Sequence, residues 1–475
     1  MKGLREIISI SAFIPNKGPM LDLYDICLNE EVDRSEAIQV FKKKRSSSNF
    51  YITYSRLKNN ALDGILLQKF GRLTTAQKER VKLLIGFTQA KILFHLNKKV
   101  AFLELADKII KRAKGMGFLE MAISVSRTLE LHYSETTPNA KKHQHYQNEG
   151  RKLRELLNME IDLEQIYTSL ILAYQKKKLK KCSFDSFDDY IADRPILNQP
   201  KFRYYYHTLI NLKADFEKDE ATFLSNTESA LSFFERSNFT LPGVTKLNFL
   251  INLLPIYISR ENYIRAEGTI NGCLSLTVKG GFNWHLIMLY KALYGFQTNK
   301  PSIALQAWTE AQKYIGNLEK TQLINRWMMV EGYLALYHVL GRIQFNDKFR
   351  FGRFANTIKQ GRKDYPQKAN FMVLELMFYL ATRNLKKFTK VSLTLDYEIP
   401  RYFNTRYFKR TKYFLRCLKS VVRGNFTVNG TKRHAVTDWN RLQSQSTEYD
   451  LNRLDREVVP YELLWEEVLI LLSKG

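Results

Sequence analysis

A run of cationic side chains between residues 401 and 423 is the strongest chemical feature of this sequence. The stretch RYFNTRYFKRTKYFLRCLKSVVR contains eight Lys or Arg residues and no acid. Guanidinium and ammonium groups can pair with phosphates or carboxylates. Wound as an α-helix, five of the cations fall in one stripe, because their spacing alternates between three and four residues: Lys409, Lys412, Arg416, Lys419 and Arg423, with Tyr402 and Tyr413 beside them.

The same stretch has an apolar side, which is the side that a helix buries. At helical spacing, the residues opposite the cations are Phe403, Tyr407, Phe414, Leu418 and Val421. We therefore predict an amphipathic helix that packs on a helical body and exposes a cationic face edged by tyrosines.

A second cationic segment, residues 349–368, precedes the first. Its cations are Arg350, Arg353, Lys359, Arg362, Lys363 and Lys368, against Asp364 alone, with Phe349, Phe351 and Phe354 between the first of them. Arginine beside exposed rings suits single-stranded nucleic acid, because guanidinium groups pair with phosphates and rings stack on bases. The alternative is that the rings belong to the core and the cations form a solvated rim.

Acidic residues near the C-terminus allow a third interpretation of the stripe. From residue 434 onward, acids outnumber bases eight to four. Glu462, Glu466 and Glu467, on the last expected helix, could cover the cations within the same molecule.

Patterns for catalysis or metal binding are weak. His132, His143 and His145 are close in sequence, but they lack the helical i,i+4 pair or carboxylate partner typical of a zinc site. Gly424 and Gly430 do not form a phosphate loop, because five residues separate them instead of four and no strand is expected there. We therefore predict no catalytic residue, no cofactor and no metal site.

Composition indicates a globular protein with an excess of positive charge. Of the 475 residues, 45% are hydrophobic, and 74 Lys and Arg against 47 Asp and Glu give a net charge of +27. Such a charge repels itself in a compact fold unless nucleic acid, an anionic membrane surface or an acidic protein relieves it. The alternative is that the excess is spread over the surface as solvated lysine.

The cysteines and the apolar runs indicate the cellular compartment of the protein. Cys27, Cys182, Cys273 and Cys417 are far apart and form no CxxC pair, which predicts buried thiols in a reducing compartment. No apolar run reaches the roughly 18 residues that a membrane span needs, and Glu6 argues against a signal peptide. We predict a cytoplasmic protein without a transmembrane segment.

The N-terminal region predicts short helices at 21–29 and 35–44 and a longer one from Asn49. The third carries Arg56, Lys58 and Lys69, so a helix-turn-helix reader of DNA is one interpretation. Helical hairpins that cap an array are commoner, and we favour them here.

From residue 75 onward the pattern becomes helix, short break, helix, and one spacing recurs in the second helices. A bulky residue lies between two small residues that are seven positions apart: Ala106, Ile110 and Ala113, then Ala266, Ile270 and Cys273, then Ala304, Trp308 and Ala311. The small residues let two helices approach closely, and the bulky one fills the gap between units.

Around the second occurrence the chain resembles a tetratricopeptide repeat, whose helix pairs read L-x3-Y and then G-D-Y-x-x-A-x3-F-x2-A. Leu253 and Tyr257 lie upstream, and Glu261-Asn262-Tyr263 stands in place of Gly-Asp-Tyr. The next unit has Asn299-Lys300-Pro301 as its turn and departs from the pattern with Gly295 in place of Tyr.

Three further segments, SRTLELHY, GGFNWHLIMLY and FRFGRFANTIKQGRKDYPQKAN, extend this likeness. The layout from about Tyr54 to Phe426 resembles a large, uncharacterised bacterial family of tetratricopeptide-like proteins. The resemblance implies an all-α, tetratricopeptide-like helical-hairpin array (an α-solenoid) with a small helical N-terminal region. It implies no reaction.

We predict four parts: an N-terminal helical region (1–72), a first hairpin block (73–182), a second block with a basic surface (183–432) and an acidic C-terminal segment (433–475). Stacked hairpins form a curved surface that binds peptides or helices, so a non-enzymatic scaffold for a protein partner is expected. The alternative is a nucleic-acid-binding protein that uses residues 350–423. The expected contact residues are Arg350, Arg353, Arg362, Lys363, Tyr402, Lys409, Lys412, Tyr413, Arg416, Lys419 and Arg423.

Overall fold

The structure of the protein is a computed structural model. It describes residues 17–27, 34–45, 49–57, 75–176, 178–192, 196, 198–236, 243–318, 322–345, 349–360, 365–403, 408–445, 454 and 456–474. Within these ranges every regular element is a helix and none is a strand, so the predicted all-α fold class is confirmed.

The chain divides into two compact units, Met1–Arg154 and Glu155–Gly475. In the first, α2 (Lys17–Cys27), α3 (Arg34–Lys44) and a helix at 50–57 share a small core of Met20, Leu23, Tyr24, Phe41, Phe50 and Leu57. Of the cations considered for a DNA reader, Arg56 is exposed, and Lys58 and Lys69 lie outside the described residues.

The rest of the first unit is a run of paired helices: α5 (Thr75–His95), α6 (Lys99–Gly115), α7 (Leu119–Leu131), a π-helical turn (His132–Thr136) and α8 (Ala140–Gln175), which ends in the second unit. Asn97 and Gly117, with φ of 55° and 74°, lie in the turns that follow α5 and α6. On α6, Ala106 and Ala113 are fully buried, as the recurrent spacing predicts.

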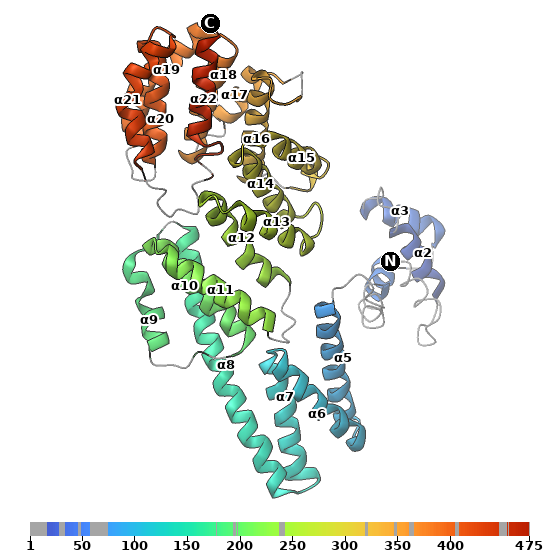
Figure 1. Cartoon of the computed structure of the whole chain (residues 1–475). Coiled ribbons are helices and arrows are strands. Elements are labelled where there is room, and N and C mark those ends of the chain that lie inside the picture. The colour runs from blue at the N-terminus through green and yellow to red at the C-terminus, as the bar shows by residue number, and fades with distance from the viewer. Residues whose placement is uncertain are drawn as a thin grey trace. The chain divides into compact units, whose positions relative to one another are not determined.

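Helices of the second unit pair in sequence order (Figure 1). The hairpins are α10/α11, α12/α13, α14/α15, α18/α19 and α20/α21. The helices are α9 (Asp185–Ala192), α10 (Pro200–Glu217), α11 (Glu220–Arg236), α12 (Gly243–Ser259), α13 (Tyr263–Ser275), α14 (Phe282–Gln297), α15 (Pro301–Gln312), α16 (Gln322–Val339), α17 (Phe351–Gln360), α18 (Tyr365–Ala381), α19 (Leu385–Tyr402), α20 (Lys409–Arg423), α21 (Val428–Gln443) and α22 (Tyr461–Ser473). Short 3-10 turns lie at Lys181–Phe184 and Ile315–Asn317.

A left-handed turn residue recurs at regular intervals in this unit. Residues with positive φ follow α12, α14, α16, α18 and α20, and their successive intervals are 38, 42, 42 and 42: Glu261, Asn299, Gly341, Arg383 and Asn425. After each, the next backbone N–H bonds five residues back, as from Asn262 N to Tyr257 O at 2.9 Å. This bond satisfies a carbonyl oxygen that has no hydrogen-bond partner within its own helix. The left-handed residue ends that helix and turns the chain toward the next one.

Small residues allow the two helices of a hairpin to approach closely. Ala266, Cys273, Ala304 and Ala311 are fully buried, as the recurrent spacing predicts. Gly295, which departs from the tetratricopeptide pattern, lies where α14 meets the start of α15. A Cβ atom there would lie 2.7 Å from the backbone nitrogen of Ala304 and 3.1 Å from the carbonyl oxygen of Lys300. The absence of a side chain at Gly295 therefore makes this contact possible.

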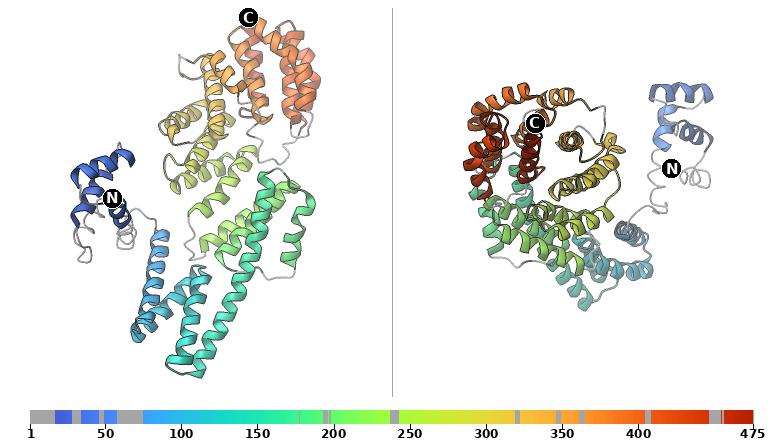
Figure 2. Two further views of the ribbon diagram at one scale, coloured as in Figure 1. Left: turned by 180° about the vertical axis from the view of Figure 1, so that it is seen from behind. Right: turned by 45° about the horizontal axis from the view of Figure 1, so that its top comes forward.

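The C-terminal segment, defined here as residues 454 and 456–474, returns along the inside of the second unit. Its helix α22 packs on α18 and α21, and Figure 2 shows it in dark red, enclosed by the curve of the other helices. The buried side chains of α22 join the main core: Tyr461, Leu464, Trp465, Val468, Leu471 and Leu472. The segment is therefore part of the fold rather than an appended tail.

We predict that Gly295→Ala destabilises the second unit by about 1–3 kcal/mol, because the new methyl group overlaps the backbone of α15. The matched control is Gly272→Ala on α13, where an added Cβ meets nothing within 4 Å. This control should be neutral or stabilising by about 0.5–1 kcal/mol, since alanine favours the helix. Chemical denaturation measures both, and equal effects of the two substitutions would contradict the close approach.

Candidate binding surface

The predicted amphipathic helix exists but is shorter than expected. Phe414, Leu418 and Val421 of α20 are fully buried, which confirms its predicted apolar side. The prediction of one helix from Arg401 is wrong, because α19 ends at Tyr402 and Phe403 leaves the helical conformation to enter the core. Tyr407 lies outside the described residues.

The cationic stripe lies on the solvent side of α20, but carboxylates from both neighbouring helices reach it. Arg416 Nη1 lies 3.6 Å from Asp438 Oδ1 on α21. Lys419 donates a hydrogen bond to Asp396 on α19, and this bond holds the pKa of that carboxyl below its usual value. Lys409 and Arg423 are exposed, whereas Lys412 is half-buried. The stripe is thus partly neutralised within the fold.

The two tyrosines predicted to edge the stripe belong to different environments. Tyr413 is half-buried and packs against the main core. Tyr402 belongs to α19, and Lys368 Nζ lies 3.3 Å from the centroid of its ring. Neither ring is fully exposed, so neither forms an open stacking platform.

The second cationic segment does not expose its rings. Phe351 and Phe354 on α17 are buried, and Phe351 stacks on Phe378 of α18 with ring centroids 4.3 Å apart. Of the two interpretations of these rings, placement in the core is confirmed for Phe351 and Phe354, and stacking on bases is wrong for both. Arg353 is exposed, and Arg350 donates to the Phe349 carbonyl at 3.3 Å.

The predicted contact residues do not gather on one element. α17 packs on α16, whereas α20 packs on α18, α19 and α21. Arg362 and Lys363, also expected to bind the partner, lie outside the described residues.

Acids of the C-terminal segment pair with cations outside the stripe. Glu467 accepts hydrogen bonds from Arg342 at 2.7 and 2.9 Å, and Glu462 accepts from Arg410 at 2.9 and 3.0 Å. Glu466 is exposed. Glu462 and Glu467 therefore pair with Arg410 and Arg342 rather than with cations of the stripe, and the interpretation that these acids cover the stripe is wrong.

Arg410, which is also on α20, turns inward. Its Nη2 lies 2.7 Å from Glu457 Oε1, its Nε lies 2.9 Å from Glu457 Oε2, and the two side chains are 15% and 3% exposed. Burial opposes the charge of the guanidinium, but the carboxylates of Glu457 and Glu462 outweigh burial and raise the pKa of Arg410. Sequence spacing did not single out Arg410, because it lies outside the stripe.

Other polar groups hold the backbone of the C-terminal segment. The side-chain amide of Gln297, at the end of α14, donates to the carbonyl oxygens of Glu457 at 2.7 Å and Val458 at 3.2 Å. Tyr461 donates to the carbonyl of Arg456 at 3.0 Å, and its hydroxyl lies 2.8 Å from Thr411 Oγ1. A non-helical stretch of chain is therefore bound through its main chain as well as its side chains. We call the surface that bears Gln297, Arg410 and Thr411 around this segment, together with its continuation along the same side of α14 to Asn283, the inner face.

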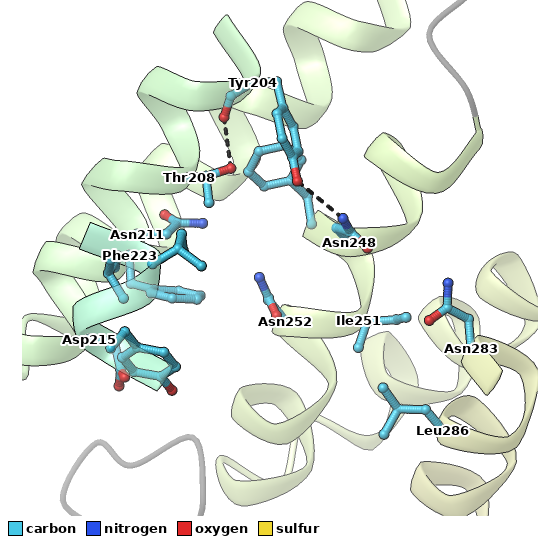
Figure 3. Close-up of a pocket in the computed structure, with 14 residues that line it drawn as sticks. Tyr204, Thr208, Asn211, Asp215, Phe223, Asn248, Ile251, Asn252, Asn283 and Leu286 are labelled. Atoms are coloured by element: carbon cyan, nitrogen blue, oxygen red, sulfur yellow. Dashed lines mark hydrogen bonds between the residues drawn. The ribbon is translucent and has the colours of Figure 1, made fainter. Parts of the chain in front are cut away.

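A pocket of about 340 Å³ opens between α8, α10, α12 and α14. Figure 3 shows Tyr204 and Asn211 from α10 on one side and Asn248, Asn252 and Asn283 from α12 and α14 on the other. Sequence reasoning missed this site, because its polar residues are scattered over several helices and form no motif.

A buried network fixes the wall of the pocket on α10. Asn211 donates to Thr227 at 2.8 Å, and Asn226 donates to Asn211 at 2.6 Å and to the His207 carbonyl at 2.8 Å. His207 Nδ1 lies 2.7 Å from Asn226 Oδ1, while its Nε2 is buried and makes no hydrogen bond within the described residues. Burial lowers the pKa of His207, which favours the neutral ring.

The described cysteines differ in exposure. Cys273 and Cys417 are buried, and burial raises the pKa of each thiol to about 12. Cys182 is exposed, so the prediction of buried thiols is wrong there, and the side chain of Cys27 lies outside the described residues.

In the described ranges no group of three or more His, Cys, Asp or Glu side chains is placed to hold a metal ion. None of the described helices combines the length and apolarity required to cross a bilayer.

Comparison with protein-family models, with curated proteins and with solved structures found no match.

We predict that Arg410→Ala lowers the free energy of unfolding by about 3–5 kcal/mol, because the buried carboxylate of Glu457 loses the guanidinium that pairs with it. The control is Arg416→Ala, which removes a solvent-accessible ion pair and should cost about 1 kcal/mol or less. Urea denaturation of both variants tests the difference. A loss no larger for Arg410→Ala than for Arg416→Ala would show that the C-terminal segment does not depend on this pair.

The burial of His207 predicts acid sensitivity. The pKa of His207 is lower when folded than when unfolded, so the unfolded chain binds the proton more readily. Stability is therefore full above about pH 6.5 and decreases as the pH falls toward the folded-state pKa, by at most about 1.4 kcal/mol per pH unit. His207→Gln should reduce the loss measured between about pH 7.5 and 5.5, compared with the unmodified protein. An unchanged pH dependence in His207→Gln would contradict this assignment.

Proposed function

We propose that the protein is a non-enzymatic binding scaffold whose second unit is a tetratricopeptide-like array of helical hairpins, an α-solenoid that binds a protein partner. Two features support the array. The left-handed turn residue recurs at intervals of 38 to 42, and the buried small residues recur at the crossings of α12/α13 and α14/α15. Regular hairpins of this kind stack into a curved surface suited to extended partners.

The observation that carries the proposal is that the inner face binds a segment of the chain itself. Gln297 bonds to two main-chain carbonyls, Arg410 pairs with two carboxylates, and the buried side chains of α22 join the main apolar core. Main-chain bonds combined with apolar pockets are the means by which proteins recognise peptide segments. The helix that carries Gln297, α14, also lines an open pocket through Asn283 and Leu286 near its other end.

A nucleic-acid partner at residues 350–423 has less support. Phe351 and Phe354 are buried, and Asp396 and Asp438 pair with two cations of the stripe. A protein partner at the inner face requires neither exposed rings nor an unpaired cationic stripe.

A site-specific photo-crosslinker tests the proposal. It is placed at Leu286, which lines the open pocket, and in a control protein at Ile264 on α13, which is 88% exposed. After irradiation in cells of the source organism, we expect a defined crosslinked protein from position 286, absent from position 264 and resistant to nuclease. The adduct is measured by electrophoresis and mass spectrometry.

Two outcomes would contradict the scaffold proposal. One is crosslinking of the same proteins from both positions, which indicates random encounter. The other is loss of the partner after nuclease treatment, together with a slope of log affinity against log salt of roughly −3.5 to −4.5, as expected when about five phosphates are neutralised. That pair of results would favour nucleic acid instead.

A further inference from the structure

The open pocket of the inner face has a composition that identifies the class of its ligand. We propose that it binds an extended, uncharged peptide segment of the partner through main-chain hydrogen bonds to Asn252 and Asn283. This inference rests on the proposed scaffold function and adds to it a site and a ligand chemistry.

Asn252 and Asn283 present side-chain amides that the fold does not use. Asn252 on α12 is exposed and Asn283 on α14 is half-buried, and neither amide makes a hydrogen bond within the described part of the chain. Asn211, deeper in the same pocket, is by contrast bonded to Thr227 and Asn226. An amide carries both a donor and an acceptor, so it can pair with the C=O and N–H of a peptide chain.

The molecule contains an internal precedent for this mode of binding. Gln297 on α14 uses its side-chain amide to donate to two successive carbonyls of the non-helical stretch before α22. Asn283 lies fourteen residues earlier on the same helix, which is close to four turns, so both amides are on one side of α14. Gln297, at one end of α14, binds main-chain carbonyls. Asn283, at the other end, has the same functional group and makes no hydrogen bond to the described residues.

The two amides come from helices that pack against each other. Asn252 is on α12 and Asn283 is on α14, and both side chains line the pocket. One extended segment that runs from α12 to α14 can therefore meet both amides.

Charge excludes a polyanion from this pocket. Among its lining residues the one carboxylate is Asp215, which pairs with Lys218 at 3.1 Å, and no Lys or Arg side chain lines it. The pocket therefore lacks the cations that phosphate requires, although the whole chain has a net charge of +27.

Apolar side chains complete the pocket and set its preference. Ile251, Leu286 and Phe249 lie beside the amides and offer contact to aliphatic side chains of the ligand. Alternate side chains of an extended chain point to opposite sides, so one set would enter this apolar area while the main chain meets the asparagines. The expected ligand is thus a segment with aliphatic residues and no charges.

The experiment uses the full-length protein. A displayed library of short random peptides without charged residues is selected on it, and the dissociation constant of a selected peptide is measured by fluorescence anisotropy. The Asn252→Ala/Asn283→Ala double variant should bind at least about tenfold more weakly, because each lost hydrogen bond changes affinity several-fold. The matched control, Asn440→Ala at an exposed position of α21, should stay within about twofold.

A second measurement separates main-chain recognition from a general effect of the substitutions. N-methylation of the peptide backbone, one amide at a time, should reproduce the loss at one or two positions. The double variant should keep the thermal unfolding midpoint of the unmodified protein, since neither amide supports the fold. Absence of any selected peptide, or equal binding by the double variant, would overturn the proposal.

The two proposals fail in different ways. If the crosslink from position 286 persists in the double variant, the scaffold stands and the main-chain role of the asparagines is rejected. If no partner is crosslinked from position 286 in the unmodified protein, the scaffold itself fails.

Discussion

Close approach of backbone to backbone is the constraint on which the second unit depends. Gly295 lies against the first turn of α15, and at the α20–α21 crossing Gly424 and Gly430 face each other in the same manner. Larger side chains at these points would hold the helices farther apart and shift every later hairpin. The apolar core can run continuously from α12 to α22 because these crossings are tight.

Much of the fold could be predicted from the sequence, because helical periodicity of apolar residues is a strong local signal. The regular interval between the left-handed turn residues could not be predicted from the sequence. Glu261 and Arg383 adopt positive φ at two of these turns, although neither residue type favours the left-handed region. The residue types at these positions therefore do not indicate the turn. Asn299 and Asn425 are of a type that does favour it, but two asparagines in a long chain are an insufficient signal.

The candidate site was harder to predict, because charge spacing does not reveal which group a side chain meets. Arg416 and Lys419 share a stripe with their neighbours, yet their carboxylate partners come from other helices. Arg410 is one position after Lys409 of the stripe and turns inward, which depends on the return of the C-terminal segment. Asn252 and Asn283 are ordinary polar residues in sequence and gain significance only when α12 and α14 are placed side by side.

The return of α22 also bears on how the chain acquires its structure. A plain row of hairpins can form progressively, since each repeat contacts only its neighbours. Here Gln297 bonds to Glu457, which is 160 residues away, and such distant contacts must overcome loop-closure entropy before they stabilise anything. During synthesis, the apolar inner side of the early hairpins should therefore stay exposed to solvent until α22 has left the ribosome. We expect a chaperone to have its greatest effect during that interval.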